Sequence, residues 1–152
     1  MTDVAKDEAE LVERAAKALH YDYCDYSRST LKWCNVSVLI GKTLTSVTHN
    51  KDSDSVHFVT EDDKQYVMIH LRDCCEDVYL ADTTGDLNDL VGAPIFTAEH
   101  RANSEDKPLF KYDISHTWTF YELATIKGSV TLRWYGSSNG YYSECVDFME
   151  VV

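Results

Sequence analysis

The sequence lacks the features of a membrane-spanning or secreted protein. No apolar run approaches the ~20 residues that a helix needs to cross a bilayer. The opening stretch MTDVAKDEAELVERAAK does not have the basic and then apolar layout of a signal peptide. We therefore expect a soluble, cytoplasmic protein that does not engage a membrane.

Basic residues are also scarce. The 152 residues include 14 Lys and Arg against 26 Asp and Glu, which gives a formal net charge of −12. Affinity for a phosphate backbone comes from cationic side chains that release counterions, so direct DNA binding is disfavoured. An acidic surface fits a protein partner with a basic surface better, including a partner that normally holds nucleic acid.

Regularly spaced cysteines are absent. The chain has five cysteines, an odd number, and none of them forms a Cys-x2-Cys pair. In a cytoplasmic protein this usage favours reduced thiols over a disulfide framework. We expect no disulfide and no cofactor.

The length of the chain fits one domain, because single cores commonly close at ~100–200 residues. We assign residues 1–38 to an N-terminal helix and an aromatic connector, and residues 39–150 to a β-rich core. The connector is residues 21–35, which are aromatic and polar without a regular period. The helix is expected because apolar residues recur on one face between charged residues, namely Val4, Leu11, Ala15 and Leu19.

The rest of the chain is rich in β-branched and aromatic residues separated by turn material. It predicts a meander of three strands, a further strand, a short helix after Thr84 with Asp86 as its N-cap, another strand, and three antiparallel strands at the end. The last three are joined by tight hairpins at Lys127-Gly128 and Asn139-Gly140. The expected strands are 38–50, 55–63, 65–71, 77–84, 93–100, 116–126, 129–136 and 141–151.

The predicted fold class is therefore α+β. We expect a twisted, mostly antiparallel, curled or barrel-like sheet of six to eight strands, with the N-terminal helix and the short helix packed on it. Residues 101–115 are polar and aperiodic, and are read as a loop that is either a lid or a surface excursion. Alternation selects the core positions Trp118, Phe120, Val130, Leu132, Trp134, Val146 and Phe148.

The stretch HLRDCCEDVYL, residues 70–80, is the most chemically suggestive segment. It offers His70, Cys74 and Cys75 as metal ligands, but a continuous strand would place His70 about 13 Å from Cys74 at ~3.3 Å per residue. A nucleophilic thiol would need a base, and the spacing does not select one from the available histidines, His70, His100 and His116. We favour buried, inert cysteines and solvated acids here, with no catalytic residue.

A ligand site is the alternative. Three tyrosines near the end of the chain could stack a nucleotide base while a nearby cation meets its phosphate, although aromatic residues are also common on ordinary sheet faces. The residues concerned are Lys127, Arg133, Tyr135, Tyr141 and Tyr142.

Two long strings, DCCEDVYLADTTGDLNDLVGAPI and HTWTFYELATIKGSVTLRWYGSSNGYYSECVDF, carry a family resemblance. They resemble a family of small bacteriophage and prophage proteins catalogued as a domain of unknown function, over roughly Leu39 to Phe148. The resemblance implies a phage accessory protein in the cytoplasm of an infected bacterium. It supplies no catalytic residues.

We therefore expect a non-enzymatic phage accessory protein that binds and inhibits a host defence component through an acidic surface. The first alternative is a protein that sequesters a nucleotide-type signal, and the second is a metal- or thiol-dependent enzyme. The acids expected to contact the partner are Glu8, Glu10, Glu13, Asp22 and Asp25.

Overall fold

A computed structural model describes residues 30–152, in which nine strands form two antiparallel sheets. Their bounds are β1 (Leu31–Trp33), β2 (Leu44–Asn50), β3 (Ser55–Thr60), β4 (Gln65–Ile69), β5 (Asp77–Thr84), β6 (Thr97–Asn103), β7 (Ser115–Thr125), β8 (Gly128–Ser138) and β9 (Asp147–Val151). The first sheet has five strands in the order β1-β9-β4-β3-β2, and the second has four in the order β5-β8-β7-β6.

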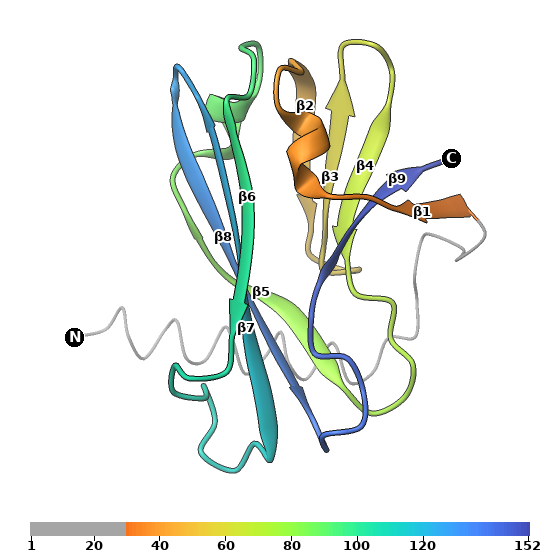
Figure 1. Cartoon of the computed structure of the whole chain (residues 1–152), viewed down its shortest axis with the longest axis vertical. Coiled ribbons are helices and arrows are strands. Elements are labelled where there is room, and N and C mark those ends of the chain that lie inside the picture. Colours follow the sequence, from red (N-terminus) through yellow and green to blue (C-terminus); the bar gives the residue numbers. More distant parts are fainter. Residues whose placement is uncertain (1–29) are drawn as a thin grey trace.

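The two sheets face each other as a sandwich (Figure 1). The predicted α+β class, with one curled or barrel-like sheet, was therefore wrong, although the antiparallel pairing is confirmed. The physical reason is that the strands segregate into two sets, each with an apolar face, and these faces bury each other instead of curling one sheet around a helix.

The only named helical elements among the described residues are two short 3₁₀ helices, η2 (Val36–Leu39) and η3 (Leu87–Leu90). The second stands where a helix was expected after Thr84, and its N-cap is confirmed, because Asp86 Oδ1 accepts a hydrogen bond of 2.9 Å from the Asn88 amide. The predicted N-terminal helix lies outside residues 30–152. Within that range, no helix has the length and apolar character needed to span a bilayer.

The meander prediction is confirmed, since β2, β3 and β4 are successive antiparallel neighbours. The connector prediction was wrong at its end, because Leu31–Trp33 forms β1 and pairs with β9. A three-residue strand is too short to show a period in sequence, and a distant strand supplies its hydrogen-bonding partners.

The last third of the chain follows the prediction only in part. A tight turn joins β7 to β8 as predicted, but its two central residues are Ile126 and Lys127, because the register pairs Thr125 with Gly128, the first residue of β8. The expected hairpin at Asn139-Gly140 does not form, because β9 enters the other sheet between β1 and β4. The chain thus crosses between sheets twice, through residues 70–76 (the first crossover) and residues 139–146 (the second crossover).

The main core lies between the sheets, and five of the predicted core positions are in it. In this cluster Phe148 stacks on Tyr66 at 5.5 Å between ring centroids and meets the Phe58 ring edge-on. Trp118 is also buried as predicted, but it packs with Tyr79 and Tyr135 in a separate cluster, and Phe120 is only partly buried beside that cluster. The predicted positions found in the main core are Val130, Leu132, Trp134, Val146 and Phe148.

Gly136 allows the second crossover to pass close over β8. A Cβ atom at this position would lie 1.9 Å from the Glu144 carbonyl oxygen, a backbone atom that cannot rotate away. Glycine is therefore required here by proximity, since only hydrogen occupies the space that a side chain would need.

We expect Gly136→Ala to lower the free energy of unfolding by roughly 1–3 kcal/mol, the usual cost of forcing extra volume into a packed site. Urea denaturation measures the change, with Ser137→Ala, a half-buried position on the same strand, as the control. An alanine variant that unfolds at the same urea concentration as the control would show that the crossover does not press on β8.

Candidate functional site

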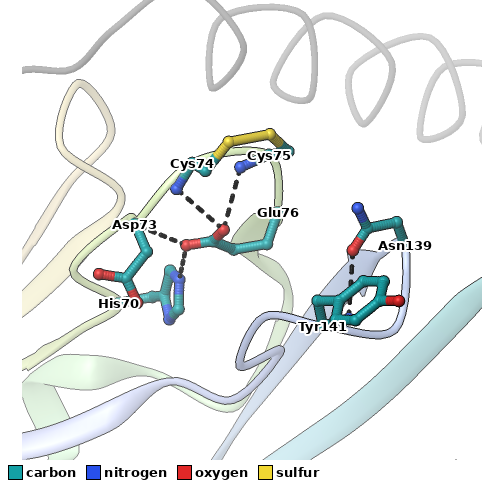
Figure 2. Close-up of a disulfide and its surroundings, with 7 residues drawn as sticks. All are labelled: His70, Asp73, Cys74, Cys75, Glu76, Asn139 and Tyr141. Carbon is teal, nitrogen blue, oxygen red and sulfur yellow. Dashed lines mark hydrogen bonds and ion pairs between the residues drawn. A yellow bond between two sulfur atoms is a disulfide. The ribbon is translucent and has the colours of Figure 1, made fainter.

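The two crossovers meet at a buried carboxylate. The side chain of Glu76 is fully buried and accepts hydrogen bonds from the backbone amides of the three preceding residues, Asp73, Cys74 and Cys75 (Figure 2). The amides of Cys74 and Cys75 both donate to Oε2 at 3.2 Å, while that of Asp73 donates to Oε1. The first crossover is therefore wrapped around its own carboxylate.

Hydrogen bonding decides the charge of Glu76. Burial alone would raise the pKa of the carboxyl group, but the Asp73 amide, the His70 ring and the other nearby amides outweigh it and lower the pKa to about 2. Glu76 is thus an anion over the whole neutral range. The expectation that this acid is solvated was wrong.

His70 carries the connection from the first crossover to the second. Its Nε2 lies 2.9 Å from Glu76 Oε1, and its Nδ1 lies 2.9 Å from the Cys145 carbonyl oxygen. An acceptor oxygen therefore faces each ring nitrogen. The His70 side chain is 6% exposed, so its contact with Glu76 is buried.

The two adjacent cysteines were predicted to be buried and reduced, and both predictions were wrong. Cys74 and Cys75 are exposed instead of buried, and they are joined in a disulfide although reduced thiols were expected. The strand argument that separated their side chains does not apply, because β4 ends at Ile69 and the chain bends at the two cysteines. Figure 2 shows the sulfur atoms on the side of the loop away from the Glu76 carboxylate.

The second crossover contains its own buried acid and a thiol. Glu144 accepts hydrogen bonds from Thr117 Oγ1 at 2.9 Å and from Ser138 Oγ at 2.6 Å. Burial raises the pKa of the Cys145 thiol, and the charges of Asp147 and Glu144 act in the same direction. Cys145 therefore stays protonated at neutral pH and is a poor nucleophile.

Two small hollows adjoin this region. The first, of about 180 Å³, is lined in part by His70, Asp73 and Asp147. The second, of about 210 Å³, lies between strands of the two sheets and brings Cys34 and Cys145 to one cavity. Trp33 contributes to both hollows, although it is 69% exposed.

The predicted metal set is not assembled. His70 is engaged by Glu76 and the Cys145 carbonyl group, while the Cys74 and Cys75 sulfurs lie on the outer side of the loop. Across residues 30–152, no three His, Cys, Asp or Glu side chains are grouped so that they could hold a metal ion.

The predicted nucleotide-binding residues are spread along the second sheet. Lys127 precedes β8 and Tyr141 follows it, and the eleven residues of that strand span about 36 Å at ~3.3 Å per residue. Tyr135 is fully buried and donates a hydrogen bond to Asp113, and its burial raises the pKa of the phenol. The five residues do not form one pocket.

The same side of the second sheet carries two cation–aromatic contacts. The guanidinium group of Arg133 lies 4.6 Å from the Trp118 ring centroid and 3.7 Å from Asp82, and the Arg101 group lies 4.7 Å from the Phe120 centroid. Arg133 is thus occupied by protein groups, in agreement with a structural role on the sheet face.

The loop read as a lid or a surface excursion is shorter than predicted, because β6 extends to Asn103. It is fastened to the second sheet by side chains that donate to its backbone. Trp118 Nε1 donates to the Lys107 carbonyl oxygen at 3.0 Å, and His116 Nε2 lies 2.6 Å from the Asp106 carbonyl oxygen. His100 lies apart, beside Tyr121 in the second hollow, so the three candidate histidines occupy separate environments.

The residue that sequence reasoning missed is Glu76. Its role was not visible in the sequence, because the three amides that it accepts belong to a bend that has no period or turn motif. The acids predicted to contact a partner, from Glu8 to Asp25, lie outside the part of the chain that the structure describes.

A family model with the description "Domain of unknown function (DUF7448)" matches residues 37–148. No curated protein matches the chain. No solved structure matches it either.

We expect Glu76→Gln to lower the free energy of unfolding by about 3 kcal/mol at pH 7, because each unit of pKa shift corresponds to ~1.4 kcal/mol. The carboxyl group protonates near its ordinary pKa of 4.5 in the unfolded chain and near 2 in the folded chain. Its stabilisation is therefore present above pH 4.5 and is lost as the pH falls toward 2.

Urea unfolding at pH values between 7 and 2 measures this difference. The gap between wild type and Glu76→Gln should narrow below pH 4.5, whereas Glu105→Gln, at an exposed position, should match wild type throughout. A gap of constant size across this range would mean that ionisation of Glu76 does not stabilise the fold.

Proposed function

The chain belongs to the DUF7448 family, and we propose that it is a non-enzymatic binding protein whose acidic surface engages a basic surface of a protein partner. In the form that the phage resemblance suggests, it is an accessory protein that acts in the cytoplasm of an infected bacterium. Its partner is a host defence component, of the kind whose basic surface normally holds nucleic acid.

The observation that carries this proposal is the exposed acidic excess. Many acidic side chains of residues 30–152 are exposed on turns and loops, and this exposure is what a basic partner surface would meet. Negative charge on exposed turns attracts a basic partner and accelerates their association. The exposed acids on turns and loops include Asp52, Glu61, Asp62, Asp63, Asp86, Glu105 and Asp106.

The thiols support binding over thiol catalysis. Burial raises the pKa of the Cys34 and Cys145 thiols, so neither provides the thiolate that a nucleophilic cysteine requires. The buried carboxylate of Glu76 is already fully occupied by His70 and three amides, which suits a structural anchor better than a general base.

Capture of partners from bacterial lysate on the immobilised full-length chain tests the proposal. Binding of a basic protein should weaken steeply between 0.1 and 1 M salt, because the screening length falls from ~10 to ~3 Å. Added duplex DNA should compete with the chain if the partner surface normally holds nucleic acid.

Two sets of charge-neutralising variants locate the surface. One replaces Glu8, Glu10, Glu13, Asp22 and Asp25 with their amides, and the other replaces Glu61, Asp62 and Asp63. At least one set should reduce capture by ~10-fold or more, whereas Glu99→Gln, at an exposed position of β6, serves as the single-charge control. Capture that is insensitive both to salt and to these variants would overturn the acidic-surface proposal.

A further inference from the structure

We propose that Cys74 and Cys75 form a solvent-exposed thiol–disulfide exchange site that takes dithiol reductants as its substrate class. The two cysteines are adjacent, exposed and joined in a disulfide at the bend of the first crossover. Cys34 and Cys145 differ in kind, because both are half-buried free thiols.

The direction of the bend makes the sulfur atoms accessible. The amides of Asp73, Cys74 and Cys75 all point inward to the Glu76 carboxylate, and the sulfurs lie on the opposite side of the loop (Figure 2). Attack on a disulfide requires access of the incoming thiolate to a sulfur atom, and no opening of the core is needed here. Glu76 is the positioning residue of this site, because it fixes the backbone that presents the pair.

The exchange balances as an ordinary two-electron reaction. One thiolate of the reductant attacks a cysteine sulfur, forms a mixed disulfide and releases the other cysteine as a thiolate that takes up a proton. The second thiol of the reductant then displaces the first cysteine, which is also protonated. Two electrons and two protons pass to the protein, and the reductant leaves as its own disulfide.

Reduction or oxidation of the cysteine pair affects the buried Glu76 carboxylate directly, through the backbone of the two cysteines. The amides of Cys74 and Cys75 both donate to Oε2 of Glu76, so the residues that change covalently are the residues that hold the carboxylate. Glu76 in turn contacts His70, which reaches the second crossover at the Cys145 carbonyl oxygen. Reduction should therefore loosen the amides of the first crossover.

The experiment treats the native full-length chain with a dithiol reductant, without denaturant, and then adds phenylarsine oxide. A trivalent arsenical condenses with two neighbouring thiols to form two As–S bonds and releases water. We expect one arsenical bound to residues 74–75 of each reduced chain, mapped by peptide mass spectrometry, and none at these residues on the oxidised chain. Hydrogen exchange of the Cys74 and Cys75 amides should accelerate on reduction.

Single serine variants provide the controls. Cys74→Ser and Cys75→Ser should each lose at least ~100-fold in arsenical affinity, because a bidentate site gains this much from its second contact. Cys34→Ser should bind as the wild type does. The proposal is overturned if reduction of the pair requires denaturant, or if Cys74→Ser retains the arsenical.

Discussion

The fold depends on the hydrogen bonding of one buried carboxylate. An ionised carboxylate removed from water costs several kcal/mol unless donors replace the water. Three consecutive amides and the His70 ring replace it at Glu76, so the first crossover must adopt the one backbone path that aims all of them inward. Since His70 also reaches the Cys145 carbonyl oxygen, the same group holds together the two connections between the sheets.

This arrangement separates the chemistry of the site from its surface. The Glu76 carboxylate and the His70 ring find their hydrogen-bonding partners inside the protein. The disulfide of the first crossover and the acids of the turns are exposed. A binding protein needs such a division, because a rigid scaffold positions exposed loops without consuming their contact groups. The proposed binding surface and the proposed exchange site are therefore independent features of one scaffold.

Local patterns in the sequence predicted the local structure well. The alternation in β7 and β8 with a tight turn between them, and Asp86 as a cap, are decided by neighbouring residues. Neighbouring residues do not decide the placement of β9, because its partners β1 and β4 are remote in sequence. The Asn139-Gly140 signal favours a hairpin that does not form. Burial of Glu76 escaped prediction for a related reason, since it requires the backbone bend that the carboxylate itself stabilises.

A double-mutant cycle between His70→Gln and Glu76→Gln tests the central claim most directly. If the buried pair joins the two crossovers, the unfolding free energies should show a coupling of about 1.5–3 kcal/mol, as expected for hydrogen bonds to charged groups. Effects that add within about 0.5 kcal/mol would contradict the account, because the two residues would then stabilise the sandwich independently.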